Sequence, residues 1–289
     1  MKIGVLSDIH GNVWALKECL KYLEKENADA YFFLGDYIGE LPAVQECIDI
    51  IRNLAKEKRC YIIKGNKEEY LLKGICEGHT EWDEYKSVVG MLRYSASSIN
   101  YETKSFLCNL PISMVIKFDG HKEILICHGS PNGCRIPVIS HKNGLNTELL
   151  GDINQEYIIH GHTHYQEKMD YDGKHIWNAG TVGLQCNGKT ETQFMLLTSE
   201  GQEWIPKFIS LKYDYEAVVA DMHKKNLYEI APYWARATES LITGKNRVEN
   251  GKMLMKAMEL CSQAEGSCIW PQIPEKYMKA AFEALGGSY

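Results

Sequence analysis

The sequence has no long apolar run and no closely paired cysteines. No stretch of its 289 residues approaches the roughly 18 consecutive apolar residues of a membrane span, and the apolar patch before Asp8 is too short for a signal peptide. The ten cysteines are scattered, without a C-x-x-C pair, so we expect reduced and mostly buried thiols instead of a disulfide framework. These absences predict a soluble, cytoplasmic protein without a membrane partner.

The chain also lacks an excess of positive charge. Its 32 Lys and Arg residues are outnumbered by 38 Asp and Glu residues, which gives a formal net charge of −6. Because general binding to nucleic acid requires a basic surface, this balance argues against nucleic acid as a general partner. Internal repeats and low-complexity linkers are absent as well, so the length is that of one large domain or a domain with an appendage.

Five short apolar runs each end at a residue that can bind a metal ion. The runs are rich in Ile, Val, Phe and Tyr and have the length of buried strands. Helical patterns over 13–27 and 42–58 separate the first three runs, so the sheet should begin as parallel strand–helix–strand units. Because functional crevices lie off the carboxyl ends of such strands, we expect the five ends to converge on one edge of the fold. The residues at these ends are Asp8, Asp36, Asn66, His128 and His162.

The remainder of the chain changes character twice. Three strand-like segments without intervening helices should pair antiparallel, as a second sheet or a mixed edge: 175–183, 193–200 and 203–210. Helical patterns then follow over 215–226, 233–241, 248–264 and 275–285. We therefore predict a domain over 1–212 and a helical extension over 213–289 that serves as a lid, a packing element or an oligomer contact.

Aromatic residues recur at helical spacings in this extension: Trp234, Trp270, Tyr277 and Phe282. Such residues are usually core, and they would line a lid or a self-association face if they were not fully buried.

Two further histidines extend the strand-end set to seven candidate ligands. His10 follows Asp8 by two positions, and His164 follows His162 by two. Oxygen ligands combined with imidazoles suit Mn, Fe, Zn or similar divalent ions, and seven ligands without a thiolate exceed the needs of one ion. Two ions about 3.5–4 Å apart that share a carboxylate would use the whole set and clamp the oxygens of a phosphoryl group.

This pattern resembles the calcineurin-like metallophosphoesterase superfamily, and within it the small bacterial branch that begins with SDIHGN. The resemblance spans about residues 1–200 and rests on five motifs: D-x-H at Asp8 and His10, G-D at Gly35 and Asp36, G-N at Gly65 and Asn66, HGSP at 128–131, and G-H-T-H at 161–164. It implies an α/β fold, namely a four-layer α/β/β/α sandwich of two mixed sheets flanked by helices, here followed by the helical extension.

The resemblance also implies a role for each matching residue. The first ion would be bound by Asp8, His10 and His164, the second by Asn66, His128 and His162, and Asp36 would bridge them. The cofactors would be two divalent transition metal ions (Mn2+, Fe2+/Fe3+, Zn2+ or Ni2+), and a hydroxide bridging them would attack a phosphate ester. The predicted function is therefore dinuclear-metal-dependent hydrolysis of phosphate esters. Its catalytic residues are expected to be Asp36, Asn66, Lys67 and His128.

Lys67 departs from the family pattern. In many members a histidine that helps to protonate the leaving oxygen follows G-N, and an acidic residue comes next; here Lys67 replaces the histidine and Glu68 keeps the acidic position. An ammonium is a weaker acid than imidazole at pH 7, but it is a good fixed charge beside phosphoryl oxygens. Because branches without this histidine often retain activity on diesters with good leaving groups, we predict a phosphodiesterase, with a phosphomonoesterase as the alternative.

Proteins with this fold could serve two other functions. A non-catalytic scaffold, like the retromer subunit that resembles this family, would be expected to lose ligands, whereas this chain has all seven. A nuclease is disfavoured by the acidic balance, although a groove can be locally basic.

Some residues near the motifs allow structural interpretations. Asn66 with Glu69 three positions later would also suit a helix-capping box. His160 is expected to be a core residue or to support the ligands, while Asn12 and Asn178 are candidates to orient ligands or to touch the phosphate.

Overall fold

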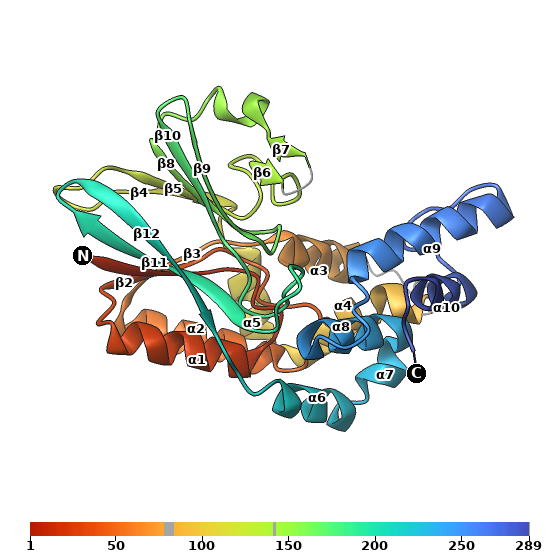
Figure 1. Ribbon diagram of the computed structural model, residues 1–289. Helices are drawn as coiled ribbons and strands as arrows, with labels where there is room; N and C mark the ends of the chain where they lie inside the picture. Colours follow the sequence, from red (N-terminus) through yellow and green to blue (C-terminus); the bar gives the residue numbers. More distant parts are fainter. Residues whose placement is uncertain (78–83, 141–142, 289) are drawn as a thin grey trace.

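The computed structural model describes residues 1–77, 84–140 and 143–288, except for the side chains of 72–77. Cys76, one of the ten cysteines expected to be reduced thiols, therefore has a side chain outside the described part. Two five-stranded sheets pack face to face, and helices flank them (Figure 1). The expected α/β fold of two mixed sheets flanked by helices is confirmed.

The first sheet has the strand order β12-β11-β1-β2-β3. Three of its strands, β1 (Lys2–Leu6), β2 (Ala30–Phe33) and β3 (Arg59–Ile62), run parallel. They are joined by α1 (Val13–Lys25) and α2 (Val44–Glu57), as the helical patterns predict. The expected antiparallel pair, β11 (Thr192–Glu200) and β12 (Glu203–Leu211), extends this sheet beside β1.

The second sheet has the strand order β4-β5-β8-β10-β9. Its strands are β4 (Ser113–Ile116), β5 (Ile124–Cys127), β8 (Tyr157–His160), β9 (Gln166–Tyr171) and β10 (Lys174–Ala179). β10 pairs parallel with β8 and antiparallel with β9, and it lies in a different sheet from β11 and β12, so the expectation that segment 175–183 pairs antiparallel with the two later segments is wrong. The reason is that β9 lies outside β10, so the hairpin brings β10 back beside β8 in the same direction.

The five candidate-ligand strands are thus divided between the two sheets, with β1, β2 and β3 in one and β5 and β8 in the other. Alternating side chains pack the sheets together: Ile3 and Val5 of β1 belong to the same buried cluster as Ile126, Ile159 and Trp177 of the second sheet. This shared apolar core fixes the relative position of the two sets of strand ends.

The outer faces of the sheets are covered differently. Buried residues of α1 and α2 pack on the first sheet. The outer face of the second sheet packs against the antiparallel pair of β6 (Ile139–Ser140) and β7 (Gly144–Leu145) and against the 3-10 helix η2 (Thr147–Leu150).

Further helices gather at the end of the molecule where the strands of interest finish (Figure 1). They are α3 (Asn66–Glu77), α4 (Lys86–Ser98), α5 (Tyr101–Cys108), α6 (Tyr215–Lys224), α7 (Leu227–Ile230), α8 (Pro232–Thr243), α9 (Asn250–Glu265) and α10 (Glu275–Ala284). Val88 and Val89 of α4 are buried in one cluster with Ala237 of α8 and Phe282 of α10. The C-terminal helices are therefore built onto α4, which belongs to the first 212 residues.

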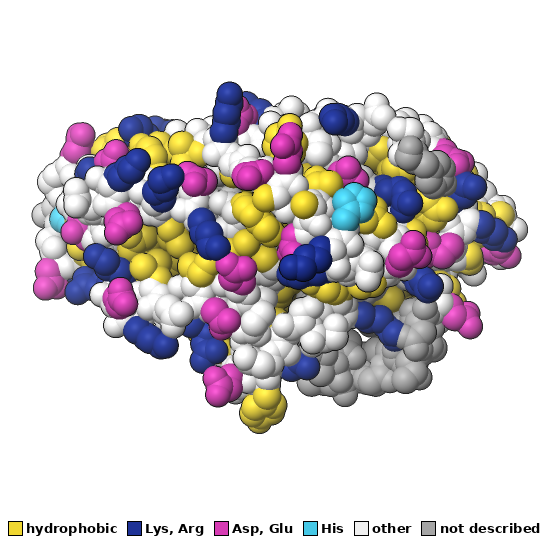
Figure 2. Space-filling view, turned by 90° about the horizontal axis from the view of Figure 1, so that it is seen from below, with side chains coloured by type: hydrophobic (Ala, Val, Ile, Leu, Met, Phe, Trp, Pro, Cys, Tyr) yellow, Lys and Arg dark blue, Asp and Glu magenta, His cyan; other side chains and the backbone are white. Residues whose placement is uncertain are grey.

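The described thiols are free, and the surface carries charges of both signs. In the described part, no helix has both the length and the apolar character that crossing a bilayer requires. The nine cysteines whose side chains are described are free, and five of them are buried. On the face shown in Figure 2, Lys and Arg side chains are interspersed with Asp and Glu side chains and with small apolar areas.

Candidate metal centre

The structure brings all seven candidate ligands together where the two sheets meet. Asp8 follows β1, Asp36 follows β2 and Asn66 begins α3 just after β3, while His128 follows β5 and His162 follows β8. Asp8, Asp36 and His128 are buried, with less than 3% of each residue exposed.

One group of three consists of Asp8, His10 and His164, whose ligand atoms lie within 4.8 Å of one another. His164 Nε2 is 3.2 Å from Asp8 Oδ1 and 3.1 Å from His10 Nε2. Two ring nitrogens that face each other at this distance share at most one proton, whereas a cation between them can accept both lone pairs. The geometry of this group therefore suits a metal ion.

The remaining ligands surround His128. Asn66 Oδ1 is 3.0 Å from His128 Nε2 and 2.8 Å from His162 Nδ1. Asp36 lies between the two groups, because its Oδ1 is 3.5 Å from His128 Nε2 and its Oδ2 is 3.8 Å from His10 Nε2. One carboxylate thus faces both sets of imidazoles.

Hydrogen bonds on the far side of two rings aim their other nitrogens at the cluster. His128 Nδ1 lies 2.8 Å from the Leu34 carbonyl and His164 Nδ1 lies 2.5 Å from the Leu184 carbonyl. A carbonyl can only accept, so each Nδ1 carries the proton and each Nε2 is left with a lone pair for a metal. Within the described part, Asp8 Oδ1 is buried without a hydrogen bond, which is the position of an oxygen that needs a cation.

The backbone around these ligands is strained. Five of the seven have positive φ: Asp8 (55°), His10 (52°), Asp36 (53°), His162 (70°) and His164 (63°). The other non-glycine residues with positive φ in the described ranges are all Asn or Asp, and Asn, Asp and His are the non-glycine residues that adopt this conformation most often. Such conformations cost about 1–3 kcal/mol each and cluster at functional sites.

The pKa shifts describe a site that favours added positive charge. Burial raises the pKa of Asp36 well above its usual value, and the nearby Glu68 and Asp8 raise it further, although His10 and Lys67 oppose this. Burial acts against charge on Asp8 and His164 too, but their mutual attraction dominates: it lowers the pKa of Asp8 and raises that of His164. A bound cation would supply the positive charge that these carboxylates stabilise.

Two glycines allow this close approach. A Cβ at Gly65 would lie 2.1 Å from Asp36 Oδ1, and a Cβ at Gly161 would lie 1.9 Å from Ser7 Oγ. A side chain at Gly65 would displace Asp36, and one at Gly161 would displace Ser7.

Glu68 joins the loops that follow β2 and β3. Its buried carboxylate accepts hydrogen bonds from the backbone N–H groups of Asp36 (2.9 Å), Tyr37 (2.9 Å), Ile38 (3.3 Å) and Gly65 (2.7 Å). Glu68 thus supplies the capping contact at the start of α3. The alternative interpretation of Asn66 and Glu69 as a capping box is not what the structure has, because the Asn66 side chain faces His128 and His162.

The supporting polar residues have separate roles. The Asn178 side chain donates to the Gly161 carbonyl (2.7 Å) and to Thr163 Oγ1 (2.9 Å), and so braces the loop that carries His162 and His164. Asn12 instead caps α1 through Ala15 N (3.1 Å) and donates to the Gly183 carbonyl (3.0 Å). Its contacts therefore hold a helix and a loop, without reaching the ligand cluster directly.

His160 is fully buried in β8, and burial lowers its pKa to about 4. It therefore stays neutral near pH 7, as expected for a core residue or a support of the ligand loop.

Sequence reasoning missed Glu40. It forms an ion pair with Lys67 Nζ, and its Oε2 lies 2.6 Å from His10 Nδ1. Glu40 and Asp36 raise the pKa of Lys67 even though burial acts in the opposite direction. The only available signal was an acidic residue four positions after Asp36, in a loop without periodicity.

A cavity of about 200 Å³ opens above the ligand cluster. His10, Asp36, Asn66, His162 and His164 line it, so these atoms are accessible to a small anionic group. Lys67 and Trp234 line the same cavity, with Lys67 Nζ 5.7 Å from the centroid of the Trp234 ring.

Two facing mixed sheets with carboxylate, amide and imidazole groups at their strand ends define an α/β protein with a candidate metal centre. Residues 1–202 match the calcineurin-like phosphoesterase superfamily domain, and the chain belongs to this superfamily.

Individual relatives are distant. The chain is similar to the uncharacterized protein MJ0912 of Methanocaldococcus jannaschii, with 24% identity over 244 residues, 78% of this chain and 94% of that protein. Its fold is similar to that of the hypothetical protein PH1004 of Pyrococcus horikoshii (TM-score 0.66, 22% identity, covering 81% of this chain and 97% of that one). A metallophosphoesterase of Sphaerobacter thermophilus shares the fold at a TM-score of 0.62, with 22% identity over 80% of this chain and 98% of that one.

Proposed function

We propose that this chain hydrolyses phosphate esters with two divalent metal ions and prefers diesters to monoesters. The observation that carries the proposal is the position of Asp36, whose two oxygens face His10 and His128 in the two groups of candidate ligands. A carboxylate so placed can be shared by two ions, which is the arrangement that in-line displacement at phosphorus uses.

The protein's own groups would divide the work. Asp8, His10 and His164 would hold one ion, Asn66, His128 and His162 the other, and Asp36 both. When bound, these ions would supply the charge that activates water and neutralises the phosphoryl oxygens. Lys67, held by Glu40 on the cavity wall, would add a fixed positive charge beside the substrate.

The preference for diesters rests on Lys67. At this position many members of the superfamily have a histidine that helps to protonate the leaving oxygen. This chain has Lys67 there, and its ammonium group forms an ion pair with Glu40. Esters with good leaving groups need no proton donor, and aryl diesters are such substrates. A monoester with a poor leaving group would depend on the missing histidine.

Hydrolysis of the diester bis(4-nitrophenyl) phosphate and of the monoester phenyl phosphate, which has a poorer leaving group, tests this proposal with added Mn2+ or Ni2+. We expect turnover of the diester to exceed that of the monoester, and Lys67→His to raise monoester hydrolysis relative to diester hydrolysis. Lys64→His, three positions earlier in the chain, is the matched control and should leave the ratio unchanged. If neither ester is hydrolysed, the enzyme proposal fails; if Lys67→His leaves the ratio unchanged, the role given to Lys67 is wrong.

We further propose that residues 213–289 act with α4 as one wall of the substrate entrance. Trp234 of α8 already lines the cavity above the ligands, which supports this role.

A further inference from the structure

A second, larger cavity of about 610 Å³ adjoins the metal centre. Glu40, Asn66, Lys67 and Trp234 line both cavities, so the two are neighbours across these side chains. A phosphate ester whose phosphoryl group reaches the ligand cluster would therefore place the rest of the molecule in the larger cavity. Its volume is that of a small-molecule site.

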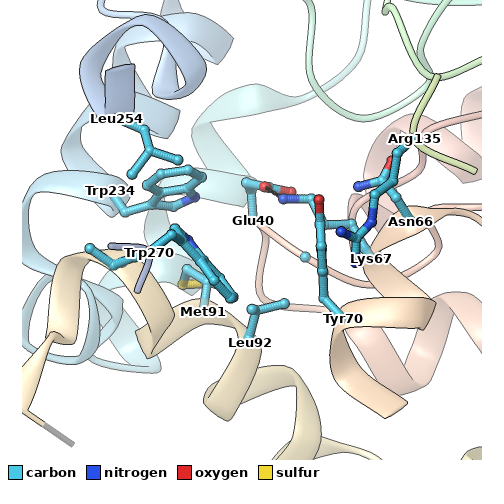
Figure 3. A pocket seen from close by; sticks show the side chains of 12 residues that line it. Glu40, Asn66, Lys67, Tyr70, Met91, Leu92, Arg135, Trp234, Leu254 and Trp270 are labelled. Atoms are coloured by element: carbon cyan, nitrogen blue, oxygen red, sulfur yellow. Dashed lines mark hydrogen bonds and ion pairs between the residues drawn. The ribbon is translucent and has the colours of Figure 1, made fainter. Parts of the chain in front are cut away.

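The walls of this cavity are mainly aromatic and apolar. Figure 3 shows Trp234, Trp270 and Leu254 on one side and Tyr70, Lys67 and Arg135 on the other. The Tyr70 and Trp270 ring centroids are 6.0 Å apart, and the Arg135 guanidinium lies over the Tyr70 ring at 4.4 Å from its centroid. Two indoles, a phenol and a guanidinium around one space offer flat faces, which select a planar ring more strongly than a flexible aliphatic group.

The residues that form these walls come from separate parts of the chain. Tyr70 belongs to α3 and Trp234 to α8, while Trp270 lies between α9 and α10 and Arg135 between β5 and β6. The C-terminal residues 213–289 thus contribute two of the aromatic faces. Trp270 is 36% exposed, whereas Tyr277 and Phe282 of α10 are buried core residues.

We propose, on the basis of the proposed function, that this cavity binds a planar aromatic ring carried by the phosphate ester, of the size of a nucleobase. The ring stacks among Trp234, Trp270 and Tyr70 while the phosphoryl group reaches Lys67 and the ligand cluster. The charged end and the aromatic end of the substrate then match the two adjoining cavities.

The test compares ligands that differ only in the ring. Calorimetric titration of the Mn2+-loaded full chain with adenosine 5′-monophosphate and with ribose 5-phosphate isolates the base, and phenyl phosphate distinguishes a simple aryl group from a nucleobase. We expect the nucleotide to bind at least roughly tenfold more tightly than the sugar phosphate, since stacking of one base commonly contributes that much. Tighter binding of phenyl phosphate than of the nucleotide would support binding of an aromatic ring but would contradict the proposal that the ring has the size of a nucleobase.

Variants then connect this preference to the cavity. Trp270→Ala should lower the affinity for the nucleotide about tenfold and leave that for ribose 5-phosphate unchanged, while Trp270→Phe should retain most of the preference. Ile269→Ala is the matched control, because Ile269 is 69% exposed beside Trp270. Equal affinity for both ligands in the unmodified chain, or an unchanged preference in Trp270→Ala, overturns the proposal.

The outcomes are separable from those of the proposed function. Hydrolysis of aryl diesters without a preference for the ring would refute only the cavity assignment. A ring-dependent affinity without any ester hydrolysis would instead refute the enzyme proposal.

Discussion

Replacing Glu68 by Gln tests how the strand ends are held together. Glu68 Oε1 accepts the N–H groups of Tyr37 and Ile38, and Oε2 accepts those of Asp36 and Gly65. A glutamine amide has one oxygen, so in either orientation its NH2 group faces two backbone donors. Each buried donor left without an acceptor costs about 1–3 kcal/mol, so the free energy of unfolding should fall by about 2–6 kcal/mol.

Urea unfolding of the chelator-treated protein measures this loss without any contribution from bound metal. Thermal unfolding of the same protein is a second measurement. With an unfolding entropy of about 2.1 cal/mol/K per residue, the loss of free energy should lower the melting temperature by roughly 3–10 °C. Glu69→Gln is the control, because the Glu69 carboxylate is partly exposed and its ion pair with Arg135 is long, at 3.9 Å. This substitution should change the free energy of unfolding by less than about 0.5 kcal/mol. Equal effects of the two substitutions would refute the role given to Glu68.

Three further predictions concern the candidate metal centre. Asp36→Asn should lower metal-dependent ester hydrolysis by more than roughly 100-fold, since it removes the shared charge; activity above a tenth of the original would argue against a bridging role. Asn178→Ala should weaken Mn2+ binding by about 10–100-fold with an unchanged circular dichroism spectrum, because it frees the loop of His162 and His164; unchanged affinity in a metal titration would count against this. Glu40→Gln should also weaken Mn2+ binding by about tenfold through His10, whereas the exposed control Glu46→Gln should not; equal affinities would show that Glu40 does not orient His10.

The convergence of the candidate ligands could be predicted because each apolar run ends at a polar residue. Runs of this kind locate strand ends, and parallel strands place those ends on one side of a sheet. The division of the five strands between two sheets could not be predicted in this way. The residue pattern of a strand that is buried on both faces does not indicate which strands pair with it. The parallel pairing of β10 with β8 was missed for the same reason.

Other features depend on contacts between distant segments. No sequence pattern identified α3, α4 and α5, and the buried face of α4 is explained only by the C-terminal helices that pack on it. Glu40 and Arg135 lie in loops, where periodicity gives no information. Their roles become evident only from contacts in the fold, the ion pair of Glu40 with Lys67 and the stacking of Arg135 on Tyr70. The sequence predicted which residues could bind metal, whereas the aromatic cavity required the assembled fold.

Metal content is the most direct test of the central claim. The purified chain, saturated with Mn2+ and freed of excess ions, should contain two ions per molecule by elemental analysis, and Asp36→Asn should contain fewer. A chain that binds no transition metal would contradict the account of a dinuclear centre at the strand ends. Two ions that persist in Asp36→Asn would contradict the bridging role of this carboxylate.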